Sequence, residues 1–340
     1  MSAQTATFCR WVERETGFTG VEILRPLAGG NSNVTNLVRT NEGLLVLRHP
    51  PTETISDRAA AGIAREFRFI SAIAGKAPVA EPIAFCEDKE MLGVPFSLTR
   101  FVEGEAITDT LPDGYGEGSA TIDAIGFALV GALARVHVIT PVPAGPGGIE
   151  KGEKFVSRQI KRWRDLRSRQ AVRDLPQMDQ LGSWLADHAP QPEAVRIVHC
   201  DYHLDNVLMD QSRPQVNAIL DWEMATLADP LVDLGLVTAF WNRTESNSLG
   251  FSFVQQVSNS PAVVHRDELA SRWSEATGLS TGNLAYYQAF SLWRLAAIVE
   301  GAYVLYRQGL VDGAYERGLE RDVPLLLQEA ERFARVQGMV

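Results

Sequence analysis

The stretch HCDYHLDN, residues 199–206 of this 340-residue sequence, decides the fold. It follows the apolar pair Ile197-Val198 and precedes the apolar residues 207–209, so we expect a tight polar loop between two short strands. Four residues separate Asp201 from Asn206, and a loop of that length can turn so that both side chains point into one cleft. There a carboxylate can accept a proton from a hydroxyl, and an amide oxygen can bind a metal ion.

A second carboxylate follows at Asp221, in AILDWE, where the apolar residues 218–220 predict a strand that delivers it to the same cleft. Next, ADPLVDLG places Asp229 before Pro230, which predicts a helix with an Asp cap and a Pro in its first turn. Asp233 lies one turn into that helix. The order His-x-Asp-x-x-x-x-Asn, then Asp, is that of the kinase catalytic loop and its magnesium-binding carboxylate.

These segments resemble the aminoglycoside phosphotransferase family, a branch of the protein-kinase-like superfamily. HCDYHLDNVL, LDWE and DPLVDLG are most similar to the phosphotransferase domains related to those joined to acyl-CoA dehydrogenases. The resemblance covers nearly the whole chain and includes GGNSNVTNLV, LVLR, REFRFISAI, FVEG and YYQAFSLWRLAAIVEG. It implies a two-lobed, protein-kinase-like α+β fold. The small N-terminal lobe would hold an antiparallel sheet and one helix, and the larger C-terminal lobe would be mainly helical.

The resemblance also implies a reaction, in which the γ-phosphoryl group of ATP or GTP passes to a hydroxyl of a small molecule. On this resemblance Asp201 is the catalytic base, and His199 supports the loop by hydrogen bonding. Asn206 and Asp221 are the metal ligands, and Asp233 anchors the catalytic loop from below. Mg²⁺ is the expected ion, since one amide, one carboxylate, phosphate oxygens and waters suit it.

The first hundred residues predict a small sheet. Extended runs from residue 21 onward are broken by Asn/Gly turns at 29–31 and 41–43, which indicates a hairpin. Two further strands are expected at 83–86 and 95–102, and residues 57–75 have helical spacing. Other helices are expected at 6–16, 122–137, 155–169, 177–188, 283–309 and 318–337. The expected boundary separates a nucleotide-binding lobe, residues 1–103, from a catalytic and acceptor-binding helical lobe, residues 104–340.

The first hairpin turn is a candidate phosphate-binding loop. It contains Gly30, Asn31, Ser32 and Asn33. Small residues let backbone N–H groups approach phosphates, and Ser and Asn side chains add donors. The pattern is neither G-x-G-x-x-G nor a Walker motif, so a plain hairpin turn is the alternative.

Arg48 stands where the kinase fold normally has a strand Lys that contacts the nucleotide phosphates. A planar guanidinium differs from a point-like ammonium, so the exchange is not neutral. Glu66, on the first long helix, is the expected ion-pair partner of Arg48, and the alternative is that both are surface residues. Arg100, Phe101 and Val102 are expected to form the hinge whose backbone meets the nucleotide base.

The acceptor is expected beside Asp201. Arg294 lies on an otherwise apolar helix, and a buried Arg needs a partner. That partner is a substrate carboxylate or phosphate, or else Glu300 or another internal acid. His203 and Asp205 contact the acceptor or only shape the loop. The acyl-CoA dehydrogenase-associated relatives imply hydroxylated acyl or carboxylic acid acceptors. An aminoglycoside or other antibiotic is the second candidate.

The composition excludes several classes of protein. A formal net charge of −10 argues against a nucleic-acid partner. The three cysteines, Cys9, Cys86 and Cys200, are far apart without metal-ligand spacing, which favours a reducing cytoplasmic setting. Residues 1–15 lack the apolar region of a signal peptide, and no uninterrupted apolar stretch long enough to span a membrane is evident. We therefore expect a cytoplasmic monomer or homodimer with neither nucleic-acid nor membrane partners.

Two further functions stay open. A non-catalytic nucleotide-binding module is compatible with Arg48 and with Cys200, a position that is often Gly in the family. The intact set of Asp201, Asn206 and Asp221 argues against it, because a binder without chemistry needs no base. A protein kinase is disfavoured because D-F-G and A-P-E signals are absent from the sequence.

Overall fold

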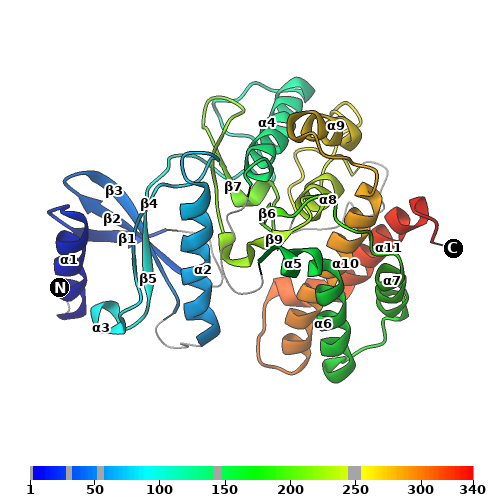
Figure 1. Ribbon diagram of the computed structural model, residues 1–340, viewed down its shortest axis with the longest axis horizontal. Coiled ribbons are helices and arrows are strands. Elements are labelled where there is room, and N and C mark those ends of the chain that lie inside the picture. Colours follow the sequence, from blue (N-terminus) through cyan, green and yellow to red (C-terminus); the bar gives the residue numbers. More distant parts are fainter. Residues whose placement is uncertain (1–2, 28–32, 52–56, 141–147, 244–253, 340) are drawn as a thin grey trace. The chain divides into compact units, whose positions relative to one another are not determined.

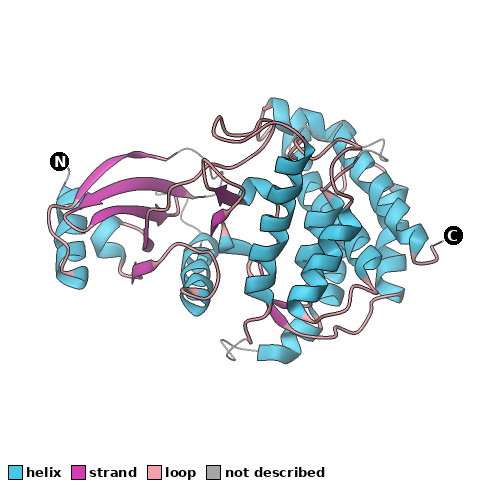
Figure 2. Cartoon of the chain, turned by 90° about the horizontal axis from the view of Figure 1, so that it is seen from above, coloured by secondary structure: helices cyan, strands magenta, loops and turns pink. Residues whose placement is uncertain are grey.

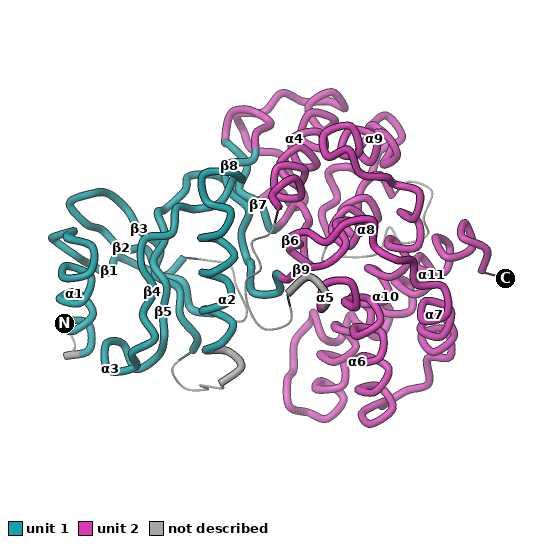
Figure 3. Tube along the Cα trace, viewed as in Figure 1, with its two compact units in different colours: residues 1–105, 206–210, 216–225 teal, residues 106–205, 211–215, 226–340 magenta. Residues whose placement is uncertain are grey.

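The computed structural model describes residues 3–27, 33–51, 57–140, 148–243 and 254–339. The chain forms two compact units (Figure 3), which are described separately here. Unit 1 contains Met1–Glu105, Asn206–Asp210 and Val216–Ala225. Unit 2 contains Ala106–Asp205, Gln211–Gln215 and Thr226–Val340. The chain therefore returns to unit 1 twice after residue 205.

Unit 1 is built on a five-stranded antiparallel sheet with the order β1-β2-β3-β5-β4. Helices α1 and α3 pack together on one side of this sheet, and α2 lies on its other side (Figures 1 and 2). The strands are β1 (Glu22–Pro26), β2 (Val34–Thr40), β3 (Gly43–His49), β4 (Pro82–Cys86) and β5 (Phe96–Arg100). The helices are α1 (Ala3–Thr16), α2 (Asp57–Ile73) and the short α3 (Lys89–Leu92).

Strand alternation divides β3 between the two faces of the sheet. Leu45 and Leu47 belong to the buried cluster that α1 completes with Phe8 and Trp11. Successive side chains of a strand point to opposite faces. The side chain of Arg48 therefore emerges on the other face, the one that α2 covers. The position of Arg48 in β3 thus determines that its side chain contacts α2 and not α1.

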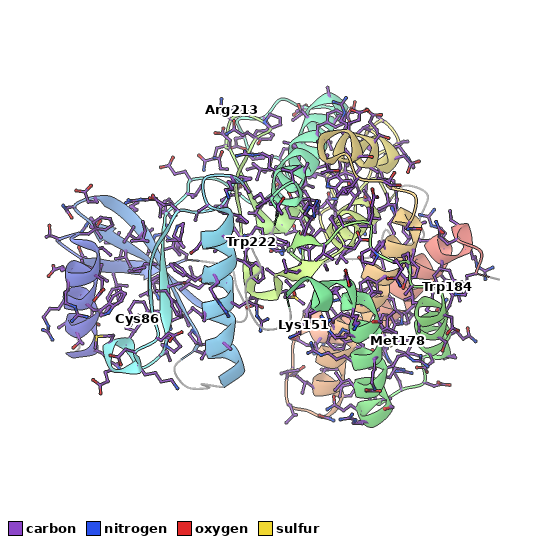
Figure 4. The ribbon with its side chains drawn as sticks, in the orientation of Figure 1. Cys86, Lys151, Met178, Trp184, Arg213 and Trp222 are labelled. Carbon is purple, nitrogen blue, oxygen red and sulfur yellow. The ribbon has the colours of Figure 1, made fainter. Side chains whose placement is uncertain are left out.

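A β-hairpin from the middle of the chain completes unit 1. β7 (Val207–Met209) pairs antiparallel with β8 (Val216–Ile219), and Met209 forms a bridge with Glu105. The short 3-10 helix η2 (Trp222–Met224) follows, and its residue Trp222, labelled in Figure 4, is fully buried. Asn206 directly precedes β7, and the N–H of Leu220 donates to the Asn206 carbonyl at 2.8 Å.

Unit 2 is mainly helical. Its one sheet among the described residues pairs β6 (Arg196–Val198) with β9 (Thr226–Ala228). The 3-10 helix η1 (Leu204–Asn206) begins in unit 2, and its last residue belongs to unit 1. Helix α10 is buried on most sides by α6, α7, α8 and α11 (Figure 1). The helices are α4 (Ser119–His137), α5 (Gly148–Glu153), α6 (Phe155–Gln170), α7 (Pro176–Asp187), α8 (Leu231–Ala239), α9 (Arg266–Thr277), α10 (Leu284–Arg307) and α11 (Ala314–Val336).

Two of these helices, α4 and α10, have the length and mean hydropathy of a membrane-crossing segment. Both are packed into unit 2, where 44% and 67% of their most apolar windows are buried. In α10 that burial also covers polar residues, including Gln288, Arg294 and Glu300. Helix α10 is thus apolar because it is a core helix of unit 2, and its buried charged side chains make contacts inside that unit.

Candidate active site

The catalytic loop predicted from HCDYHLDN lies in unit 2 and is held by one buried carboxylate. Asp233, on α8, is fully buried. Its Oδ2 accepts the backbone N–H of His199 and its Oδ1 accepts that of Cys200, each at 2.7 Å. Two charge-assisted bonds to adjacent amides fix the start of the loop more firmly than neutral bonds would. In the structure, Asp233 contacts the loop as the family resemblance implies.

A histidine that sequence analysis missed orients this carboxylate. Nε2 of His137, at the end of α4, lies 3.2 Å from Asp233 Oδ2. The indole N–H of Trp273 donates to His137 Nδ1 at 3.1 Å. Because an indole nitrogen only donates, Nδ1 must accept, and the proton of His137 stands on Nε2 facing Asp233. Three buried side chains from α4, α8 and α9 therefore support the loop.

The loop itself is bent into an unusual conformation. Cys200 has a φ of 69°, in the left-handed region that residues other than Gly rarely adopt. His199 is buried, and its Nδ1 accepts the N–H of Asp201 at 3.3 Å. The hydroxyl of Tyr202 donates to the carbonyl of Leu129 in α4. The bond between the Asp201 N–H and His199 Nδ1 is a contact through which His199 can support the loop, as the family resemblance implies.

His203 lies between two carboxylates. Its Nδ1 is 3.0 Å from Asp205 Oδ2, and its Nε2 is 3.6 Å from Asp201 Oδ1. Burial alone would lower the pKa of His203, but its bonds to Asp201 and Asp205 raise that pKa well above the ordinary value. A protonated His203 consequently bridges the two acids. The structure thus gives His203 and Asp205 contacts that shape the loop, whereas an acceptor contact remains a prediction.

Asp201 is kept in its charged form by the same surroundings. Burial alone would raise its pKa, but the His203 bond and the charges of His203, His199 and Arg294 hold the pKa well below the usual range. One third of its side chain stays exposed. Asp201 is therefore an accessible, permanently ionised carboxylate at neutral pH.

In unit 1, Arg48 emerges from β3 into a group of three acids. Its Nε lies 3.1 Å from Glu66 Oε2, its Nη2 donates to Asp221 Oδ1 at 2.6 Å, and Glu223 lies 4.0 Å away. The Glu66 contact lacks hydrogen-bond alignment, since neither of its two atoms makes a hydrogen bond. The alternative that Arg48 and Glu66 are independent surface residues is wrong, because Glu66 is buried and the pair is in contact.

Among the described residues, this group carries more negative than positive charge. One guanidinium lies near three carboxylates, a formal sum of −2. The pKa of Glu66 is raised to about 7, mainly because the carboxyl group is buried; Arg48 opposes this rise, and Asp221 and Glu223 add to it. A divalent cation would supply the missing charge.

The two expected metal ligands come from the same hairpin. Asn206 precedes β7 and Asp221 follows β8, with Val207 opposite Ile219. Antiparallel pairing therefore brings both residues to one end of the hairpin. An amide oxygen and a carboxylate beside excess negative charge suit Mg²⁺, which prefers oxygen ligands and keeps several waters. The chemistry of these donors fits the ion, and Asn206 and Asp221 would hold it.

The remaining nucleotide-side residues have mixed positions. Gly30, Asn31 and Ser32 lie outside the described residues. Asn33 is described, and its amide donates to Glu223 Oε2 at 3.0 Å. Arg100 ends β5 and bonds the carbonyl of Glu42, so its side chain braces the sheet. The N–H of Phe101 donates to the Leu44 carbonyl, and a hinge at residues 100–102 that meets the nucleotide base stays a prediction.

Arg294 on α10 is buried, and its Nη1 donates to the carbonyl of Cys200 at 2.8 Å. The proposal that Glu300 neutralises Arg294 is wrong, because Glu300 pairs with Arg173, whose Nε donates to Oε1 at 3.0 Å. Arg294 and Glu300 both belong to α10 but lie six residues apart, so their side chains leave the helix in different directions. Arg173 reaches Glu300 from the segment between α6 and α7.

Arg48→Lys is expected to weaken Mg²⁺-dependent nucleotide binding about tenfold, the scale of lost second-layer support in metal sites. Arg48 reaches Glu66 and Asp221 with different nitrogens, and a single ammonium cannot hold both. Isothermal titration of ATP with and without Mg²⁺ measures the effect. Arg39→Lys, on neighbouring β2 and paired with exposed Glu22, is the matched control. Unchanged or tighter binding in Arg48→Lys would contradict this role.

The family model described as "Phosphotransferase enzyme family" matches residues 23–266. Acyl-CoA dehydrogenase family member 10 of Mus musculus is 30% identical over 325 residues, which cover 95% of this chain and 30% of that protein. Family member 11 of Gallus gallus is 30% identical and covers 85% of this chain and 38% of that protein. The chain thus spans about a third of these curated relatives.

Solved structures agree. A Ralstonia eutropha JMP134 protein with the provisional name aminoglycoside phosphotransferase is 27% identical, with a TM-score of 0.81 over 97% of this chain and 98% of that one. An aminoglycoside phosphotransferase in ternary complex with AMP-PNP and hygromycin B is 15% identical, with a TM-score of 0.60 over 98% of this chain and 99% of that one. These likenesses confirm the predicted two-lobed, kinase-like α+β fold class and the resemblance to this family.

Proposed function

Since this chain belongs to the phosphotransferase enzyme family, we propose that it transfers the γ-phosphoryl group of ATP or GTP, with Mg²⁺, to a hydroxyl of a small molecule in the cytoplasm. The observation that carries this proposal is the presentation of Asp201. Its loop is anchored through Asp233, and its carboxylate is ionised and partly exposed. A chain that only bound nucleotide would need no carboxylate held in this way.

The residues divide the chemistry between them. Asp201 orients the acceptor hydroxyl and takes its proton as the new oxygen–phosphorus bond forms and the bond to the nucleoside diphosphate breaks. Asn206 and Asp221 would hold the metal ion, which would neutralise charge on the nucleotide phosphates. Arg48 keeps Asp221 in place and adds positive charge next to it. Most of the rate enhancement in such transfers comes from positioning and electrostatics.

A hydroxylated carboxylic acid or acyl-CoA is the proposed acceptor class. Two observations support it. The curated relatives carry acyl-CoA dehydrogenase names, and the buried cation Arg294 acts electrostatically on Asp201. A positive charge at this place disfavours a polycationic aminoglycoside, so antibiotic phosphorylation is the second candidate. Because similar solved structures contain hygromycin B or kanamycin, aminoglycosides are included among the acceptors to be tested.

ADP release from ATP and Mg²⁺ across an acceptor panel tests the proposal. The panel holds hydroxy acids, hydroxyacyl-CoAs, aminoglycosides, macrolides and amino alcohols, with GTP run in parallel. We expect acceptor-dependent release with a hydroxy acid or hydroxyacyl-CoA, and mass spectrometry should show the phosphate on the acceptor hydroxyl.

The same assay with Asp201→Asn separates enzyme turnover from contaminating phosphatase. Release that disappears in this variant supports transfer by this chain, and release that persists contradicts the assignment of the base. Stimulation by aminoglycosides alone would replace the proposed acceptor class with the second candidate. If the chain binds ATP with Mg²⁺ but neither phosphorylates an acceptor nor hydrolyses ATP, it is the non-catalytic nucleotide-binding module.

A further inference from the structure

Arg294 is a buried cation that touches the catalytic loop at one backbone carbonyl. We propose that Arg294 is a positioning residue, which holds the Cys200 carbonyl and so fixes the peptide bond between Cys200 and the base Asp201. The proposal rests on the proposed phosphotransferase function for its kinetic consequence, but its structural consequence can be measured without turnover.

The conformation of Cys200 needs support from outside the loop. The left-handed conformation is strained for a residue with a Cβ, and such conformations persist where surrounding contacts hold them in place. Cys200 is a buried side chain with a φ of 69°. It directly precedes Asp201, so a change at the Cys200 peptide would redirect the carboxylate of the base.

Opposite charges hold the two polar groups of Cys200. Its N–H donates to the Asp233 carboxylate at 2.7 Å, and its carbonyl accepts from Arg294 Nη1 at 2.8 Å. Asp233 comes from α8 and Arg294 from α10, two helices that pack together. The N–H lies in the peptide group between residues 199 and 200, and the carbonyl lies in the peptide group between residues 200 and 201. Each of these peptide groups is held by one charge-assisted bond, which is stronger than a neutral one. Together the two bonds fix the backbone on both sides of the Cys200 Cα.

Arg294 forms no ion pair with an acid in the described part of the chain. Among the described residues no carboxylate lies within ion-pair distance of its guanidinium, and its Nε is buried without a hydrogen-bond partner. The one acid that sequence spacing suggested, Glu300, is committed to Arg173. A buried charge is costly unless it is used. The loop carbonyl is its only hydrogen-bond acceptor in the described part of the chain, so the loop accounts for its retention in the core.

The charge of Arg294 also acts on the catalytic base. Arg294 is one of the positive charges that hold the pKa of Asp201 low, after the larger opposing influence of burial and the contributions of His203 and His199. The same charge lowers the pKa of the Cys200 thiol, although burial dominates and leaves that pKa raised to about 12. Arg294 therefore influences both the conformation of the loop and the ionisation of its carboxylate.

Hydrogen exchange measured by mass spectrometry tests the structural part on the full chain. In Arg294→Met, we expect amides in the peptide spanning 196–205 to exchange about tenfold faster or more, the change for losing one charged hydrogen bond. Arg294→Lys keeps a charged donor and should restore most of the protection. Arg266→Met is the matched control, because Arg266 is also buried in unit 2 and bonds the Asn242 carbonyl. It should leave exchange in 196–205 unchanged.

The kinetic part is a split between kcat and binding. In Arg294→Met, kcat with the best acceptor of the panel, or for ATP hydrolysis without acceptor, should fall about 10²-fold, the scale of a misplaced catalytic group. The Kd of MgATP should stay unchanged, and Arg294→Lys should recover part of kcat. Arg266→Met should keep wild-type kcat.

The outcomes distinguish the two proposals. Unchanged exchange in Arg294→Met overturns the positioning role. An unchanged kcat with a higher KM only for anionic acceptors also overturns it, and makes Arg294 an acceptor-binding residue. Faster exchange in Arg294→Met together with a wild-type chain that phosphorylates nothing supports the positioning role and refutes the proposed function.

Discussion

Asp201→Asn is expected to lower the rate of phosphoryl transfer by about 10²–10⁴-fold, the range for removal of a general base. The Asn side chain has the same shape and keeps an oxygen that can face His203 Nε2, which lies 3.6 Å from the Asp201 carboxylate. It cannot accept the proton of the acceptor hydroxyl. Nucleotide binding should survive unchanged, because the residues assigned to it, Arg48, Asn206 and Asp221, belong to unit 1.

The pH dependence of the wild-type rate is part of the same expectation. A group whose pKa is lowered is charged at every pH above that lowered value. Burial would raise the pKa of Asp201, but His203, His199 and Arg294 together lower it, so Asp201 should be fully ionised from about pH 6 to pH 8. The rate should consequently show no acid limb from this carboxylate in that interval. A weakly basic carboxylate suits a loose transition state, where orientation of the hydroxyl matters more than early deprotonation.

Initial rates of ADP release and titration calorimetry with MgATP measure both effects. Asp267→Asn is the matched control, because Asp267 is an exposed acid of unit 2 that pairs only locally with His265. Its rate should equal that of the wild type. A wild-type rate in Asp201→Asn would show that another group takes the proton, and a lost MgATP affinity would show that the variant disturbs more than the base.

The parts of the fold that follow from short-range patterns were predictable from the sequence. Period-2 alternation in β3 puts Leu45 and Leu47 on one face and Arg48 on the other. Glu66 falls at helical spacing from the apolar residues of α2. Its side chain therefore points toward the sheet face from which the Arg48 side chain emerges. The catalytic loop was found because its residues lie within eight positions of one another. In these cases local geometry decides which side chains meet.

Contacts between distant segments were not predictable. The short strands on either side of the catalytic loop do not pair with each other, since β6 pairs with β9 and β7 pairs with β8. His137 and Asp233 are 96 residues apart, and His137 reads in the sequence only as the last residue of an amphipathic helix. Such contacts depend on how distant segments pack in the folded chain, and the local pattern of a single sequence does not predict that packing.

The partner of Arg294 shows the same limit. A core helix with one Arg and one Glu suggests an ion pair six residues apart, but residues i and i+6 of a helix do not face each other. Helical geometry alone therefore argued against Glu300 and could have been applied to the sequence. The actual contacts, Cys200 for Arg294 and Arg173 for Glu300, depend on how α10 lies against its neighbours.

Asp221→Asn is expected to remove most of the Mg²⁺ dependence of nucleotide binding. Loss of a group that only supports a metal ligand costs about 10–100-fold in affinity, so loss of a charged ligand should cost at least about 10²-fold. Asp221 is the acid that Arg48 bonds at 2.6 Å, and it lies in a group whose formal charge is −2. Neutralising Asp221 halves that excess negative charge as well as removing one ligand.

Asn is a better replacement than Ala for this test. Asp221 has a φ of 60°, and Asn tolerates the left-handed conformation more readily than Ala does. Asp221→Ala adds backbone strain to the loss of the ligand, so it should unfold at a lower temperature than Asp221→Asn while binding MgATP equally poorly. A difference in stability between the two variants, without a difference in Mg²⁺ response, would separate strain from metal binding.

Calorimetric titration of ATP in Mg²⁺ and in EDTA gives the decisive comparison. Wild-type protein should bind ATP much more tightly with Mg²⁺, and Asp221→Asn should bind almost equally in both. Glu22→Gln, an exposed acid of unit 1 paired with Arg39, should keep the full Mg²⁺ response. If Asp221→Asn also kept it, Asp221 would not be a metal ligand. Its bond to Arg48 would then be structural, and the uncompensated charge around Arg48 would need a different cation partner.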